Sequence, residues 1–76
     1  MVNEKDKRIG NILQKHREVN GYSQQLIADK LGKHKSTICL WEQGKRSINM
    51  SDFIHLIEVM GYDKDQITKD VLEAFK

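Results

Sequence analysis

The middle of the chain concentrates positive charge in a way that suits contact with phosphate groups. Residues 30–46 hold five lysines or arginines and one acid, a net charge of +4, whereas residues 1–29 carry +1 and residues 47–76 carry −3. A surface that binds a polyanion needs local cations and tolerates negative charge elsewhere. The segment therefore predicts a polyanion-binding surface, and the alternative of a merely solvated lysine face stays open at this point.

Other side chains that could do chemistry lack the spacing for it. The possible metal ligands are His16, His34, His55 and Cys39, and no two of them stand four positions apart, where they would share one helix face. The sequence has no Gly-X-Ser-X-Gly or glycine-rich phosphate loop, and a single cysteine excludes an internal disulfide. We therefore expect no metal, no cofactor, no small-molecule substrate and no enzymatic activity.

The size and composition of the chain predict one small globular domain over residues 1–76. The chain has 76 residues, of which 38% are hydrophobic and 32% charged. Its longest uncharged apolar stretch is far shorter than a membrane span, and acidic Glu4 and Asp6 among the N-terminal lysines are not typical of a signal peptide. We expect a soluble intracellular protein that is stabilised by packing alone.

Helical periodicity and glycine spacing predict an all-α fold, a compact bundle of four to five helices. Four glycines each follow a helical pattern, at the position where a left-handed residue ends a helix: Gly21, Gly32, Gly44 and Gly61. Good N-cap residues precede several patterns, namely Asn3, Ser23, Asn49 and either His34 or Ser36. The expected helices lie between Asn3 and Gly21, Ser23 and Gly32, Lys33 and Gly44, Asn49 and Gly61, and from Asp65 to Phe75.

Apolar residues at helical spacing predict which faces are buried. The first three helices are expected to bury Ile9, Ile12, Leu13 and Val19, then Leu26, Ile27 and Leu31 around Ala28, then Ile38 and Trp41. The fourth helix is apolar almost all round and is expected to be the most buried. The last helix carries a stripe of Ile67, Val71, Leu72 and Phe75. This stripe predicts either a homodimer interface or packing against the first and fourth helices of the same chain.

Two short helices joined at Gly32 predict a helix-turn-helix, whose second helix can enter the major groove of DNA. From Ile9 to Gly61 the chain resembles the lambda-repressor-like (Cro/C1, XRE) family. The residues that carry the resemblance are Ile9-Gly10, Arg17, Gly21-Tyr22-Ser23-Gln24, Ala28, Leu31-Gly32, Ser36-Thr37-Ile38, Trp41-Glu42, Gly44-Lys45-Arg46 and Met60-Gly61. The resemblance implies a five-helix, sequence-specific regulator of transcription in the cytoplasm of a prokaryote, of cellular or phage origin. It also implies a homodimer on a palindromic operator of double-stranded DNA.

The resemblance also assigns roles to individual residues. It implies a buried ion pair between Arg17 and Glu42 that serves as scaffolding. Contacts with the DNA backbone are expected from Ser23, Gln24, His34, Thr37, Gln43, Lys45 and Arg46, and base reading from Lys35, Ser36 and Leu40. Lysine suits guanine, serine suits several bases, and an apolar side chain can pack on a thymine methyl group.

Leu40 departs from the family pattern, which usually has a polar or basic residue at this position. We expect it to be exposed, where either a thymine methyl group or a partner protein could cover it. The sequence therefore predicts a DNA-binding regulator, either a repressor or a Cro-like protein. The alternative is an antitoxin-like or accessory module that uses the same fold to bind a protein.

Overall fold

The computed structural model describes residues 4–75 and folds them into five α-helices, with no strand in that range. The helices are α1 (Glu4–Val19), α2 (Gln24–Leu31), α3 (Lys35–Gln43), α4 (Met50–Met60) and α5 (Lys64–Ala74). The predicted all-α class and helical bundle are confirmed. The expected N-cap Asn3 lies outside the described residues.

Most helix ends are fixed by the residues predicted to cap them. Ser23 Oγ accepts a hydrogen bond from the Leu26 N–H at 3.0 Å, and Asn49 Oδ1 accepts one from the Asp52 N–H at 2.7 Å. The glycines that follow α1 to α4 have φ angles between 65° and 74°, in the left-handed region that glycine adopts without a steric cost. α5 begins one residue earlier than predicted because Asp63 caps it.

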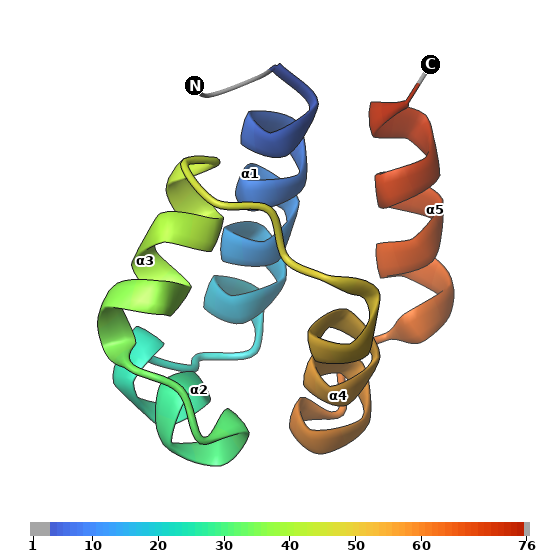
Figure 1. Cartoon of the computed structure of the whole chain (residues 1–76). Helices are drawn as coiled ribbons and strands as arrows, with labels where there is room; N and C mark the ends of the chain where they lie inside the picture. The colour runs from blue at the N-terminus through green and yellow to red at the C-terminus, as the bar shows by residue number, and fades with distance from the viewer. Residues whose placement is uncertain (1–3, 76) are drawn as a thin grey trace.

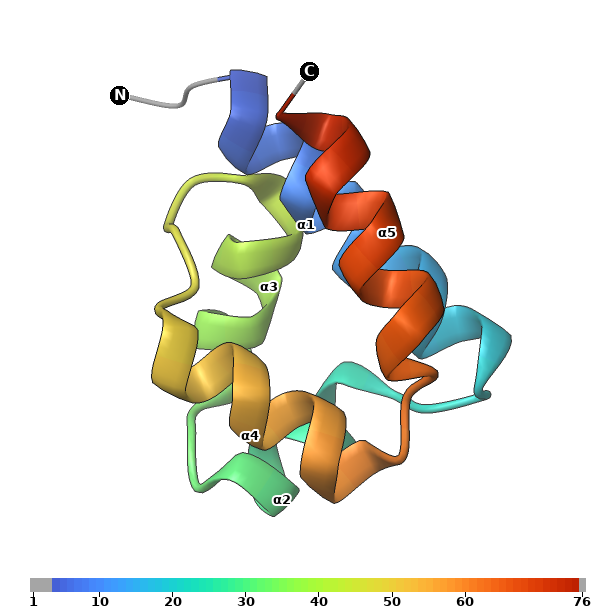
Figure 2. The same cartoon turned by 90° about the vertical axis from the view of Figure 1, so that its right-hand side faces the viewer.

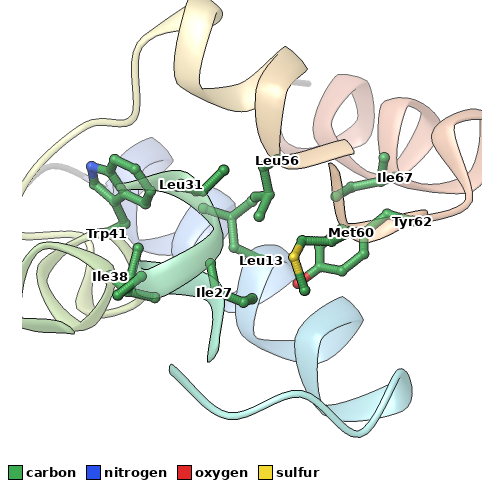
Figure 3. Packing of buried hydrophobic residues seen from close by; sticks show 10 residues of the cluster. Leu13, Ile27, Leu31, Ile38, Trp41, Leu56, Met60, Tyr62 and Ile67 are labelled. Atoms are coloured by element: carbon green, nitrogen blue, oxygen red, sulfur yellow. The ribbon is translucent and has the colours of Figure 1, made fainter. Parts of the chain in front are cut away.

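The helices are arranged around α1, which lies between α3 and α5 (Figure 1 and Figure 2). α2 packs against both α3 and α4. Buried side chains form one core, in which Leu13 of α1 lies near the middle, with Trp41 towards one end and Ile67 towards the other (Figure 3). Within residues 4–75, no helix has the length and hydrophobicity that a membrane span requires.

Several apolar positions expected in the core are exposed. Val19 is 78% exposed at the last residue of α1, and Leu26 is 36% exposed because it lies more than a quarter turn of α2 away from the buried face. The prediction that α4 is the most buried helix is wrong, since Met50 and Ile54 are 70% and 47% exposed. α4 packs mainly on α2, and this contact leaves its outer face uncovered.

α5 contributes to the core and also has an apolar outer face. Ile67 is completely buried, whereas Leu72 and Phe75 are 62% and 52% exposed. His16 Nε2 of α1 lies 2.9 Å from Asp70 Oδ2 of α5. This hydrogen bond, with a smaller effect from Gln66, lowers the pKa of Asp70 by stabilising its charged form. The predicted apolar stripe therefore divides between the core and the surface.

Two cations at the start of α1 hold the end of α5. The Lys5 Nζ atom lies 5.2 Å from the centre of the Phe75 ring, and Arg8 Nη1 donates a hydrogen bond to the Ala74 carbonyl at 3.4 Å. Cations interact favourably with aromatic faces and with the negative end of a helix dipole. Lys5 and Arg8 are three positions apart and thus share the face of α1 that meets α5.

α1 and α3 approach each other at backbone distance. A Cβ atom at Gly10 would lie 2.4 Å from the Trp41 carbonyl oxygen and 2.5 Å from the Glu42 carbonyl oxygen. A Cβ atom at Gly44, at the end of α3, would lie 2.6 Å from Lys7 Cα. The absence of a side chain at Gly10 and Gly44 therefore allows the first half of α1 to lie directly against the end of α3.

Candidate nucleic-acid interface

The turn between α2 and α3 is closed by backbone hydrogen bonds around Gly32. Gly32 has φ 67° and ψ 34°, and the Lys33 N–H donates to the Ala28 carbonyl at 2.9 Å. Ala28 has no exposed surface, and Ile38 and Trp41 of α3 are buried as predicted. These contacts fix α3 against α2 by its inner face and leave its outer face free.

The exposed start of α3 contains two of the three residues predicted to read bases. Lys35 and Ser36 are exposed, His34 before them is exposed, and Thr37 is half-buried. His34 occupies the N-cap position, but its side chain makes no capping hydrogen bond. At about 100° per residue, Ser36 lies near the middle of the outer face of α3 and Lys35 lies at one edge.

Leu40 is half-buried, so the expectation that it is exposed is wrong. It lies one turn after Ser36, about 40° from Ser36 around the helix and therefore near the middle of the outer face, and Thr37 is half-buried as well. The Leu40 carbonyl accepts hydrogen bonds from the N–H groups of Lys45 at 2.9 Å and Arg46 at 3.3 Å. Leu40 thus also anchors the loop that follows α3.

That loop and the start of α2 flank α3. Gln43, Lys45 and Arg46 are exposed, and Lys45 and Arg46 form no ion pair within residues 4–75. Ser23 is exposed at the start of α2. By contrast, the nearby Lys33 is paired with Asp52 of α4 at 3.4 Å. Lys45 and Arg46, which have no ion-pair partner among the described residues, are therefore available to an external anion.

Arg17 and Glu42 form a bidentate ion pair that joins α1 to the end of α3. Arg17 Nε donates to Glu42 Oε2 at 2.7 Å and Arg17 Nη2 donates to Glu42 Oε1 at 3.1 Å, and the two side chains are only 13% and 5% exposed. Arg17 Nη1 also donates to the Tyr22 carbonyl at 2.9 Å. The hydrogen bond with Glu42 raises the pKa of Arg17, which keeps the guanidinium charged. Burial, reinforced by the Glu42 charge, raises the pKa of nearby Tyr62.

Gln24 belongs to the same network, which the sequence did not predict. Its Nε2 atom donates to Glu42 Oε1 at 2.9 Å, so the side chain of this residue, which was predicted to contact the DNA backbone, is engaged inside the protein. Glu42 therefore receives hydrogen bonds from both α1 and α2. No periodicity or spacing in the sequence signals the Gln24 contact, because the contact depends on how the start of α2 and the end of α3 meet in space.

Sequence comparison identifies the family of the domain. The sequence profile of the HTH_3 family, described as helix-turn-helix, matches residues 13–67, which run from the middle of α1 into α5. The chain belongs to the HTH_3 helix-turn-helix family. HTH_3 domains of this XRE or Cro/C1 type are DNA-binding domains of transcription regulators. No curated protein sequence matches this HTH_3 chain.

Solved structures share the HTH_3 fold at low sequence identity. The restriction-modification controller protein C.AhdI from Aeromonas hydrophila is 20% identical with a TM-score of 0.77, over 86% of this chain and 98% of that chain. The clp gene regulator ClgR from C. glutamicum is 11% identical with a TM-score of 0.82, over 95% and 94%. The controller protein C.Esp1396I is 12% identical with a TM-score of 0.81, over 96% and 95%. These similarities establish the fold.

Metal binding has no candidate site in the part of the chain that the structure describes. Across residues 4–75, no three histidine, cysteine, aspartate or glutamate side chains gather where they could hold an ion. Cys39 is a half-buried free thiol on α3. The polar side chains that the fold does bring together include those of Arg17, Glu42 and Gln24.

Proposed function

We propose that the chain regulates transcription by placing α3 in the major groove of double-stranded DNA, as a repressor or a Cro-like protein. The observation that supports this best is the exposed start of α3, where Lys35 and Ser36 project from a helix whose inner face is held by buried Ile38 and Trp41. A recognition helix must present polar side chains outward while its position stays fixed. In this proposal Lys35 and Ser36 read base edges, and the exposed part of Leu40 packs on a thymine methyl group.

The proposed phosphate contacts lie on both sides of α3. Lys45, Arg46 and Gln43 would contact one stretch of backbone, with His34 and Thr37 near the start of α3. Ser23 and Gln24 would contact another stretch through the N–H groups at the start of α2, which have no intrahelical acceptors. The Gln24 amide is engaged with Glu42, and for that reason its proposed contribution is through the main chain.

Alanine at Lys35 and alanine at Lys45 are expected to affect DNA binding in different ways. A preferred site would first be selected from random duplexes. Lys35→Ala should then cost about 1–3 kcal/mol on that site and relax specificity at one base position, whereas Lys45→Ala should weaken binding to all sequences alike. The measurement is the affinity of each variant for the selected duplex and for single-base variants of it.

Two results would contradict this assignment. A uniform loss of affinity across all duplexes in both variants would show that Lys35 does not read bases. An affinity that hardly changes with salt would contradict DNA binding itself, because phosphate contacts release counterions and an apolar protein interface does not. The second result would favour the protein-binding module.

We further propose that the protein forms a homodimer on a palindromic site through the outer face of α5. Leu72 and Phe75 are exposed there, next to a groove of about 170 Å³ lined mostly by apolar residues of α1, α4, α5 and the segment before α4. Two-fold pairing would cover these side chains, and two α3 helices about 34 Å apart would then face successive turns of the major groove.

Leu72→Glu is expected to produce a folded monomer. The side chain of Leu72 is 62% exposed, so the substitution does not disturb the core, but it would place a charge in the dimer interface. Sedimentation measures the mass, and circular dichroism measures the helix content. Val19→Glu is the matched control, because Val19 is also an exposed apolar residue, 78% exposed, but lies at the C-terminal end of α1 and outside the proposed interface. A Leu72→Glu protein that still dimerises would move the interface away from this face.

The remaining parts of the proposal follow from DNA binding. A single domain over residues 1–76 would be enough for DNA binding, and this function would need no cofactor, no metal and no enzymatic reaction. The protein would act in the cytoplasm, where prokaryotic DNA lies.

A further inference from the structure

The first turns of α1 place one cation beside the loop that follows α3. Lys7 is exposed, and its Cα, N and Cγ atoms lie 2.6, 2.7 and 2.9 Å from the position that a Cβ atom on Gly44 would occupy. Gly44 directly precedes Lys45 and Arg46. Both views of the chain show the start of α1 beside the end of α3 (Figure 1 and Figure 2). The side chain of Lys7 therefore begins next to Gly44, where the loop that holds Lys45 and Arg46 starts.

The neighbouring cations of α1 serve a different contact. Lys5 lies over the Phe75 ring and Arg8 donates to the Ala74 carbonyl, so both are directed at α5. Around the helix, Lys7 is about 200° from Lys5 and about 100° from Arg8. The ion pairs found within residues 4–75 do not include Lys7. Within residues 4–75, Lys7 is thus a cation with no ion-pair partner, on the side of α1 that meets α3.

We propose that Lys7 binds a DNA phosphate and extends the backbone contact of the Lys45–Arg46 loop onto α1. This inference rests on the proposed DNA-binding function. Lys7, Lys45 and Arg46 would form one cationic edge that neutralises the backbone beside the base pairs that α3 reads. Such a contact carries no sequence information, because a phosphate is the same at every base pair.

Lys7 could instead act only within the protein, since a cation near the C-terminal end of α3 also stabilises the helix dipole. The two roles differ in what they change. A phosphate contact changes the dependence of DNA affinity on salt, whereas a dipole contact changes the stability of the free protein. Both quantities can be measured on the same variant.

The test is the affinity of the full chain for a short mixed-sequence duplex over a series of KCl concentrations. Lys7→Ala is expected to lower the slope of log affinity against log salt by about 0.9, the value for one lost phosphate contact. Affinity at low salt should fall by a similar factor on every sequence. Glu4→Gln should raise affinity, because Glu4 lies one turn before Lys7 and its negative charge would face the same backbone.

Lys64→Ala is the matched control, since Lys64 is an exposed lysine at the start of α5. It should leave the salt slope unchanged. A Lys7→Ala protein with the wild-type slope and a lower melting temperature would overturn the inference and assign Lys7 to the dipole of α3, while the proposed function would stand. Failure of the wild-type chain to bind the duplex even at low salt would overturn both.

Discussion

Gly10→Ala is expected to destabilise the protein by about 3 kcal/mol or more, at or beyond the upper end of the usual cost of overpacking. In an ordinary helix interior this change would be favourable by about 1 kcal/mol. Here the sign is reversed because the new methyl group would lie 2.4 Å and 2.5 Å from the carbonyl oxygens of Trp41 and Glu42. These are backbone atoms, and they cannot rotate away as a side chain can. Relief would require α1 and α3 to separate.

Denaturant melts followed by circular dichroism would measure this effect. Asn11→Ala is the matched control, since Asn11 is exposed and is the next residue of α1. Alanine there should be neutral or slightly stabilising, by at most about 0.7 kcal/mol. A Gly10→Ala protein as stable as the wild type would show that α1 and α3 do not meet at backbone distance.

Removing one member of the Arg17–Glu42 pair is expected to cost about 3–5 kcal/mol, because it leaves the other charge buried without a partner. The total stability of a 76-residue domain is only about 4–11 kcal/mol. Arg17→Met or Glu42→Leu alone should therefore remove a large part of the stability and shift the midpoint of a denaturant melt strongly downward. The double variant should be no worse than either single variant, because no uncompensated charge remains.

The same melts on both single variants and the double variant give the coupling between the two residues. Lys33→Met is a useful control, because Lys33 also forms an ion pair but its side chain is 38% exposed. Its loss should cost no more than about 1 kcal/mol. Small and additive effects at Arg17 and Glu42 would mean that solvent screens the pair and that it does not hold α1 to α3.

Local signals explain why so much of the fold could be predicted from the sequence. Ser23 and Asn49 can each satisfy the free N–H groups at a helix start, and glycine after a helix can adopt the left-handed conformation. Both effects act within four residues of the chain, so they do not depend on the rest of the molecule. The turn at Gly32 and the buried positions Ile38 and Trp41 were predictable for the same reason.

Features that depend on how distant helices meet could not be predicted from periodicity. Apolar composition suggested that α4 is buried all round, yet burial depends on which neighbours cover a helix, and α4 packs mainly on α2. The engagement of Gln24 with Glu42 joins residues 18 positions apart, and the contact of His16 with Asp70 joins residues 54 positions apart. Leu40 proved half-buried, and the loop that follows α3 folds back to donate hydrogen bonds to its carbonyl, a contact that periodicity does not predict.

The position of α1 between α3 and α5 has a consequence for how proteins of this design can diversify. The outward side chains of α3, such as Lys35 and Ser36, and those of α5, such as Leu72 and Phe75, stand on helices separated by α1. Substitutions on one outer surface can therefore accumulate without repacking the other, and under the proposed function base preference and self-association could change independently. A shift of α1 would displace both surfaces at once, so we expect substitutions at its buried positions to be the least tolerated.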